Sequence, residues 1–255
     1  MSIASDLAPV SVKKAFDMRR FFVRYGFFLL LALVFVTFAV LRPTFISTGN
    51  ITDILRSTAL AALMFLGLTW IIAAGEIDVS FMSVAALANM IVASMVAAGY
   101  GWLPATMAGL GIGLVFGLLN GLLVATLRLP ALVITIASGS LAASIAAAIG
   151  LGSSISLATT GFMGQIIKAN IGMVPLIAVF VAALYAIAWV FQEKLSFGHY
   201  VYAMEQNRAA VVEAGVPVDR ILFLLYIQSA VLSALTGVFL AADLSSGQPY
   251  LGNSY

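Results

Sequence analysis

The sequence contains seven long apolar stretches, none of which is interrupted by Lys, Arg, Asp or Glu. They cover residues 25–41, 57–74, 81–99, 103–127, 131–151, 174–191 and 221–242. A helix of about 20 mostly apolar residues crosses the roughly 30 Å hydrocarbon core of a bilayer, and a backbone in lipid must satisfy its own hydrogen bonds. The pattern therefore predicts an all-α, polytopic membrane protein with about seven transmembrane helices.

The composition excludes an ordinary water-soluble domain. Hydrophobic residues make up 63% of the chain and charged residues only 9%, whereas about a quarter of residues are charged in soluble domains. The net charge of +2 is not concentrated in a soluble segment, so nothing indicates a nucleic-acid partner. The sequence has no cysteine, which excludes disulfides, thiolate metal sites and a cysteine nucleophile. We expect the first stretch to be a retained helix, because it is longer than a signal-peptide core and lacks a small-residue cleavage site.

The distribution of basic residues predicts the orientation, because Lys and Arg near helix ends are retained on the cytoplasmic side. With the N-terminus inside, the cytoplasmic segments carry nine of the twelve basic residues, Lys13, Lys14, Arg19, Arg20, Arg24, Arg128, Lys194, Arg208 and Arg220. The opposite segments carry three, Arg42, Arg56 and Lys168. We therefore expect a cytoplasmic tail at 1–24 and a transmembrane domain at 25–255, with its largest cytoplasmic loop at 192–220.

The loop at 192–220 contains a segment that favours a helix. Residues 204–214 include good helix formers and no proline or glycine, and Gly215 and Pro217 follow as helix-ending residues. A helix of this length is not stable alone in water. It must therefore pack against something, and its composition fits an interfacial helix and a docking element equally well.

Four stretches resemble sequence blocks of one protein family. They are PTFISTGNITDILRSTA (43–59), LGLTWIIAAGEIDVSFMSVAALA (66–88), GLLNGLLVATLRLPALVITIAS (117–138) and the segment 198–255, which contains a Ser-Ser-x-Gln-Pro motif. In this order and spacing, they resemble the permease subunits of bacterial ATP-binding-cassette (ABC) importers of the ribose and simple-sugar class.

The chain departs from the pattern of that family at three places. Glu76 and Met82 stand where the family has glycine, and the Gly-Gly that usually precedes Asn207 is replaced by Glu205 and Gln206. The family also continues for several dozen residues beyond the last position of this chain. We therefore expect the chain to be C-terminally short relative to the family.

The resemblance implies a division of labour in active import. Two permease copies, identical or different, would form a pore in the bacterial cytoplasmic (inner) membrane, surrounded by lipid. A separate ATPase subunit would hydrolyse ATP, and a periplasmic or extracellular sugar-binding protein would deliver the substrate. The chain itself would bind no cofactor and act as no enzyme, in agreement with the absence of a Gly-x-x-x-x-Gly-Lys-Ser/Thr phosphate loop from the sequence.

The resemblance also implies a role for the 204–215 segment, which would couple the permease to the ATPase. The residues of this coupling segment are Met204, Glu205, Asn207, Val211 and Gly215.

Polar residues within the apolar stretches are candidates for the substrate pathway. Asn89, Asn120, Thr135 and Ser138 could hydrogen-bond the hydroxyls of a neutral sugar or polyol. Each also has a structural interpretation, because polar side chains join neighbouring membrane helices and Ser or Thr can bond its own helix. No charged residue lies within an apolar stretch, which favours an uncharged substrate.

Three other functional interpretations stay open. A permease for branched-chain amino acids shares the general helix plan of the sugar permeases. A secondary transporter would usually show ionisable groups within its spans and broken helices in inverted repeats. A truncated permease without transport activity is the third.

The segment GEIDVS at 75–80 places Glu76 and Asp78 between two apolar stretches. Asp78, followed by Ser80 at the start of a span, predicts a structural helix cap that favours the positive end of the helix. We expect Glu76 to pair with Arg128 or with the 192–220 loop. The lone histidine, His199, has no second histidine or cysteine with which to hold a metal.

Glycines recur every four residues in the fourth stretch, at positions 109, 113, 117 and 121. This spacing predicts a smooth helix face on which another backbone can approach closely.

Overall fold

The computed structural model describes residues 18–251, and the chain divides into two compact units, residues 1–51 and 52–255. In the first unit, α1 (Met18–Leu41) is an apolar helix and η1 (Pro43–Ile46) is a 3-10 turn that begins at a proline. Phe35 and Phe38 of α1 pack on Phe45, with ring centroids 5.1 and 5.7 Å from that of Phe45. Residues 18–24 of the predicted tail are thus helical, and residues 1–17 lie outside the described residues.

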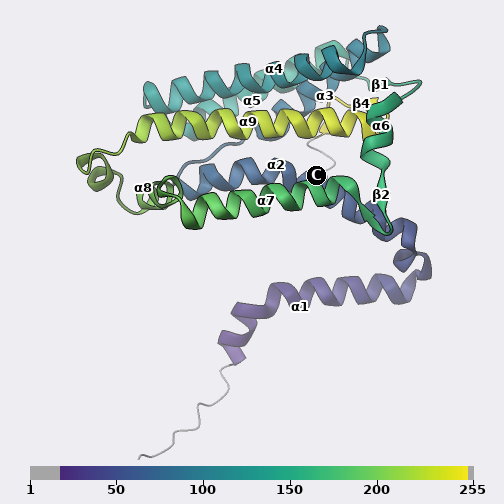
Figure 1. The fold of residues 1–255 in the computed structure, drawn as a ribbon, viewed down its shortest axis with the longest axis horizontal. Coiled ribbons are helices and arrows are strands. Elements are labelled where there is room, and N and C mark those ends of the chain that lie inside the picture. The colour runs from purple at the N-terminus through teal and green to yellow at the C-terminus, as the bar shows by residue number, and fades with distance from the viewer. Residues whose placement is uncertain (1–17, 252–255) are drawn as a thin grey trace, which may run out of the picture. The chain divides into compact units, whose positions relative to one another are not determined.

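The remaining described residues fold mainly into helices (Figure 1). These are α2 (Thr48–Ala73), α3 (Phe81–Ala97), α4 (Trp102–Gly121), the π-helical turn η2 (Leu122–Thr126), α5 (Ala131–Ile149), α6 (Gly161–Lys168), α7 (Leu176–Lys194), α8 (Ser196–Glu213) and α9 (Val218–Asp243). Two antiparallel pairs of two-residue strands complete the fold, β1 (Ile155–Ser156) with β4 (Ser246–Gly247) and β2 (Asn170–Ile171) with β3 (Val174–Pro175). Ile155 lies opposite Gly247 and Asn170 opposite Pro175 in these pairs.

Every predicted apolar stretch corresponds to a helix, which confirms the all-α, polytopic architecture. Six helices between residues 18 and 251 are long and apolar enough to cross a membrane. The seventh, α3, has only 17 residues, because the chain leaves the helix at Gly99, whose φ of +90° favours glycine.

The second unit has two layers of helices (Figure 1). The first consists of α3, α4, α5 and α9, and α2 and α7 form the second. The glycine face of α4 lies against α9. A Cβ on Gly113 would lie 2.7 Å from the carbonyl oxygen of Ala230, and a Cβ on Gly117 would lie 2.7 Å from Cα of Ile227. The prediction of a close backbone approach is confirmed, because no larger side chain fits at these positions.

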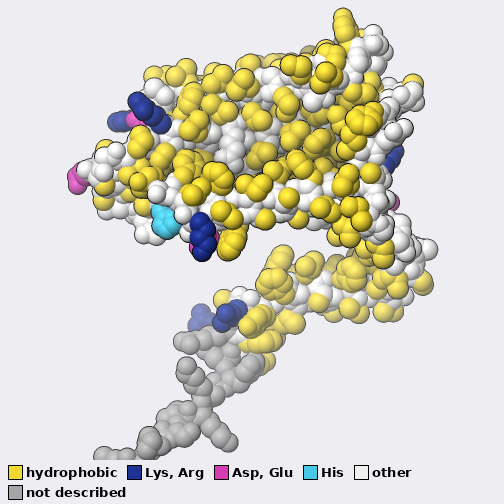
Figure 2. All heavy atoms as spheres, viewed as in Figure 1, with side chains coloured by type: hydrophobic (Ala, Val, Ile, Leu, Met, Phe, Trp, Pro, Cys, Tyr) yellow, Lys and Arg dark blue, Asp and Glu magenta, His cyan; other side chains and the backbone are white. Residues whose placement is uncertain are grey.

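Larger side chains join the second layer to the first. Near α8, Trp70 of α2 packs in one cluster with Leu225 of α9. Farther along, Leu60 of α2 and Ile177 of α7 pack in another cluster with Leu240 of α9. The visible surface of this unit is apolar along the helices, and charged side chains gather toward the α8 end and the α6 end (Figure 2). This arrangement suits helices that face lipid between two aqueous boundaries.

The helix α8 differs from the helix predicted at 204–214. It begins at Ser196, and Asn207 interrupts it with an extended backbone (φ −157°, ψ 86°). The Asn207 Oδ1 accepts a hydrogen bond from the Ala210 amide at 3.1 Å, so the side chain caps the short helical turn that follows. The prediction of an uninterrupted helix is therefore wrong at Asn207. Gly215, at a φ of +80°, follows the end of the helix as predicted.

Candidate functional site

The segment between α2 and α3, residues 74–80, carries a buried carboxylate. Asp78 is only 3% exposed. Its Oδ1 accepts hydrogen bonds from the amide and the hydroxyl of Ser80 at 2.8 and 2.6 Å, and its Oδ2 accepts one from the hydroxyl of Ser229 in α9 at 3.2 Å. Burial raises the pKa of the Asp78 carboxyl above its ordinary value, because loss of hydration outweighs these hydrogen bonds.

Ser80 stands at the N-cap position of α3, but its side chain makes no capping hydrogen bond. Its hydroxyl donates to Asp78 and accepts from Nδ2 of Asn120 at 2.9 Å. Gly139 of α5 packs on Ser80, since a Cβ on Gly139 would lie 3.1 Å from Cα of Ser80. Asp78 and Ser80 thus belong to a buried network with side chains of α4 and α9, in which Asp78 accepts the backbone amide just before α3. Their role as a helix cap stays a prediction.

Asn120 has one unsatisfied group in this network. Its Oδ1 is buried and accepts no hydrogen bond from any residue that the structure describes, while its Nδ2 donates to Ser80. The predicted close contact of Asn120 with a neighbouring helix is present, because the adjacent Gly121 lies against Phe223 of α9.

The other predicted pathway residues also lie inside the chain. Asn89 is fully buried, its Nδ2 donates to the carbonyl of Gly237 at 3.2 Å, and its Oδ1 accepts from the amide of Gln248 at 2.6 Å. Thr135 and Ser138 are buried on α5 and donate to carbonyls of their own helix, those of Leu132 and Thr135. The hydrogen bonds account for the burial of these residues without a substrate, and their pathway role stays a prediction.

An ion-pair cluster lies at the same end of the unit as α8. Arg208 of α8 binds Glu76, with 2.9 Å between Nη1 and Oε1, and its Nη2 lies 3.8 Å from Oδ1 of Asp219. Arg128 binds the other oxygen of Asp219 at 3.1 Å. Glu76 therefore pairs with the 192–220 loop, one of its two predicted partners. Asp219 joins the two arginines, and nothing in the local sequence pointed to this role.

The ion pairs border a cavity of about 720 Å³, which also contacts Val124, Pro130 and Val212. The backbone beside this cavity has an unusual conformation at two places. The π-helical turn η2 ends α4, and Arg128 follows with a φ of +56°, a left-handed conformation that is costly for a residue with a Cβ.

The predicted coupling residues divide into two groups. Met204 and Val211 are buried and pack in the cluster that contains Trp70, so they hold α8 against the membrane helices. Glu205 is exposed and lies over Gly75, where a Cβ would come within 3.3 Å of its Cα. The coupling segment is thus attached to the segment at 74–80 by close packing as well as by an ion pair.

Comparison with known proteins identifies the family. A family profile described as "branched-chain amino acid transport system / permease component" matches residues 50–254. The chain belongs to this permease family. The ribose import permease of Haemophilus influenzae is 32% identical over 246 residues, which cover 94% of this chain and 75% of the relative. The ribose import permease of Bacillus subtilis is 30% identical, with 91% and 72% covered, and the D-allose transport system permease of Escherichia coli is 29% identical, with 97% and 76% covered. No solved structure matches the chain.

These findings confirm the resemblance seen in the four sequence stretches. The protein is a multi-pass inner-membrane permease of the ABC-importer type, a family of transporters.

Proposed function

We propose that this chain is the transmembrane subunit of an ATP-driven importer that moves a small neutral sugar or polyol across the cytoplasmic membrane. Relatives named for the import of ribose and D-allose support this class of substrate. A separate ATPase subunit supplies the energy, an external sugar-binding protein delivers the substrate, and a second permease copy completes the pore.

One observation carries the mechanism, the attachment of α8 to the segment at 74–80. Arg208 binds Glu76 across 132 residues of sequence, and Glu205 packs on Gly75. Asp78 lies two residues beyond Glu76 and bonds Ser229 of α9. A displacement of α8 by the ATPase would therefore reach α3 and α9 through a short series of direct contacts.

The distribution of charge supports an orientation with α8 and the N-terminus in the cytoplasm. The basic residues Arg128, Lys194, Arg208 and Arg220 belong to the α8 end, whereas Arg56 and Lys168 belong to the end that carries α6. Retention of positive charge on the cytoplasmic side favours the α8 end as the inner one. The exposed residues of α8, including Gln206, Ala209 and Val212, would then meet the ATPase.

The family description supports a second candidate, a permease for branched-chain amino acids. An amino acid carries an ammonium and a carboxylate, which require charged or strongly polar partners at membrane depth. The seven apolar stretches contain no charged residue, and the carboxylate of Asp78 is already engaged by Ser80 and Ser229. These features favour the neutral sugar.

The direct test is uptake by the assembled importer. The permease, its ATPase and its binding protein are coexpressed, and uptake of labelled pentoses, hexoses, polyols and leucine is measured with and without ATP. We expect ATP-dependent uptake of at least one sugar or polyol. Uptake of leucine alone would favour the amino-acid candidate, and uptake of none of the compounds would overturn both.

A pair of variants tests the docking role of α8. Val212 is 55% exposed on α8, and Leu151 is 92% exposed at the opposite end. Val212→Lys should reduce copurification of the ATPase, while the control Leu151→Lys should not, because only the first lies on the proposed contact surface. Equal copurification of both variants would refute this docking surface.

A further inference from the structure

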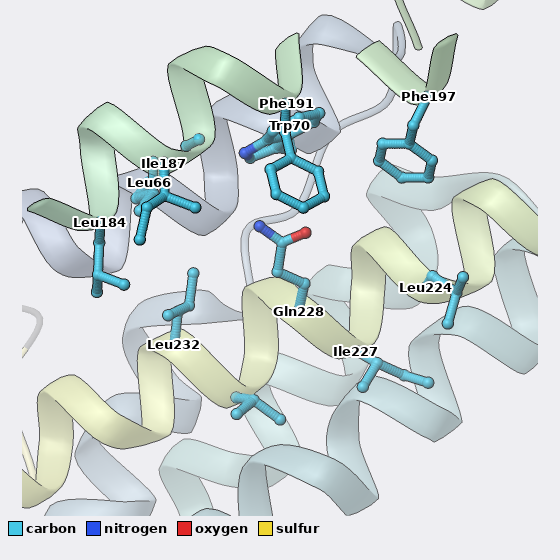
Figure 3. Close-up of a pocket in the computed structure, with 12 residues that line it drawn as sticks. Leu66, Trp70, Leu184, Ile187, Phe191, Phe197, Leu224, Ile227, Gln228 and Leu232 are labelled. Atoms are coloured by element: carbon cyan, nitrogen blue, oxygen red, sulfur yellow. The ribbon is translucent and has the colours of Figure 1, made fainter. Parts of the chain in front are cut away.

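A cavity of about 560 Å³ lies between the two helix layers, beside α8 (Figure 3). It is lined by Leu66 and Trp70 of α2, by Ile187 and Phe191 of α7, by Phe197 of α8 and by one face of α9. A volume of this size lies within the range of sites for small molecules, which are typically lined by apolar and aromatic side chains with a few polar groups.

Gln228 of α9 is the one amide in the lining of this cavity. Its side chain points toward Phe191 and Trp70 (Figure 3), and no hydrogen bond joins it to any residue in the range 18–251. By contrast, the buried amides Asn89 and Asn120 each donate to a partner in the chain. An amide without a partner in an apolar environment is costly, so Gln228 is the amide available to a ligand.

Aromatic side chains form much of the wall of this cavity. Trp70 is 3% exposed, and its Nε1 is buried and finds no hydrogen-bond acceptor among residues 18–251. The ring is held in place by Phe197, with 5.7 Å between the ring centroids. Phe191 lies beside Trp70 in the lining (Figure 3) and is 45% exposed, so its ring is partly open. The cavity thus combines aromatic surfaces with an amide that can donate and accept hydrogen bonds.

We propose that the transported monosaccharide binds transiently in this cavity, which is then a station on its path. This proposal rests on the function proposed above. A monosaccharide has apolar C–H faces that suit the half-exposed ring of Phe191. It also has hydroxyls that suit the two-way hydrogen bonding of Gln228. Phe197 belongs to α8, so a movement of the coupling helix changes one wall of the cavity directly. An acyl chain would fill the apolar part of the cavity but would leave the amide unsatisfied.

A neighbouring cavity supplies a matched control. It has a volume of about 470 Å³, lies between α6, α7 and α9, and contains no amide in its lining. Phe180 lines it, belongs to α7 as Phe191 does, and is 43% exposed, almost the same fraction as Phe191. Replacement of either phenylalanine by leucine changes a membrane helix to the same extent, but only Phe191→Leu alters the proposed station.

The first experiment measures the maximal rate of sugar uptake by the reconstituted importer with saturating, sugar-loaded binding protein. We expect Gln228→Leu and Phe191→Leu to lower this rate by roughly five- to tenfold, the effect of one lost hydrogen bond or ring contact, and Phe180→Leu to leave it unchanged. Size-exclusion profiles verify that each variant is folded. Parental rates in folded Gln228→Leu would overturn the station and leave the sugar importer intact, whereas a parent without sugar uptake would overturn the proposed function as well.

The second experiment detects occupancy without transport. The sequence has three tryptophans, so Trp102→Phe and Trp189→Phe leave Trp70 as the only tryptophan, which is excited selectively over tyrosine at long wavelength. In nanodiscs, the transported sugar should change Trp70 fluorescence, and Gln228→Leu should abolish the change. Quenching of Trp70 by lipids with brominated acyl chains, without a response to sugar, would show that lipid fills the cavity and would overturn the proposal.

Discussion

The ion pair between Glu76 and Arg208 offers the sharpest test of the coupling path. The two side chains are 19% and 42% exposed, and their charged atoms lie 2.9 Å apart. A partly exposed ion pair with a direct hydrogen bond contributes about 1 kcal/mol. We therefore predict that Glu76→Ala and Arg208→Ala together destabilise the protein by about 1 kcal/mol less than the sum of the two single effects.

The structure also ranks the single variants. Arg208 contacts Asp219, at 3.8 Å, as well as Glu76. Arg208→Ala should therefore cost more than Glu76→Ala. Arg220 is the matched control, because it is exposed at the same end of the unit and forms no ion pair with any residue of the described chain. Arg220→Ala should change stability by less than about 0.5 kcal/mol.

The assay is a double-mutant cycle on the free energy of unfolding in detergent micelles, at low and high salt. The coupling energy should fall at about 1 M salt, where the Debye length is only ~3 Å. Sugar-stimulated ATP hydrolysis by the assembled importer is measured in parallel and should fall in both single variants. Additivity within about 0.5 kcal/mol, or unchanged stimulation in both variants, would refute the role of this pair.

Three further predictions concern single residues. Gly117→Ala should destabilise the protein by about 1–3 kcal/mol through overpacking on α9. Gly111→Ala is the control and should cost nothing, because a Cβ on Gly111 meets nothing within 4 Å. Thermal unfolding of the two variants distinguishes them. Asn207→Ala should speed hydrogen exchange of the Ala210 amide, because a cap worth about 1 kcal/mol is lost; unchanged exchange would argue against the cap. Asp78→Asn should be better tolerated than Asp78→Leu, since Asn keeps a hydrogen-bonding carbonyl; equal yields of folded protein would contradict the network.

The same carboxyl predicts a dependence of stability on pH. Burial raises the pKa of Asp78 in the folded protein above its ordinary value of 3.8, so the folded state holds this proton at a pH where the unfolded state has released it. The stabilisation that this bound proton gives the folded state is therefore complete below the ordinary pKa of the unfolded chain. It is lost as the pH rises through the higher pKa of the folded protein. Asp78→Asn cannot titrate, so its stability relative to the parent should increase over that window. A constant difference between the two unfolding free energies would refute this sign.

The sequence by itself determined where the chain is helical and which parts avoid water. Length and uninterrupted apolar character predicted the membrane helices, because these depend on local composition and on the thickness of the bilayer. The four-residue glycine spacing predicted the face of α4 that another helix approaches closely. This also depends on local sequence, since residues four apart lie on the same side of a helix. The four stretches at 43–59, 66–88, 117–138 and 198–255, in this order and spacing, indicated the family that the comparisons confirmed.

Only the tertiary structure decided which polar groups meet, because hydropathy does not distinguish burial in protein from exposure to lipid. The most apolar 18-residue windows of α7 and α9 have nearly equal mean hydropathy, yet 11% of the α7 window and 61% of the α9 window are buried. Asp78 meets Ser229, and Glu76 meets Arg208, across more than 130 residues of sequence. The cavity beside α8 likewise depends on contributions from α2, α7, α8 and α9, which are far apart in the sequence.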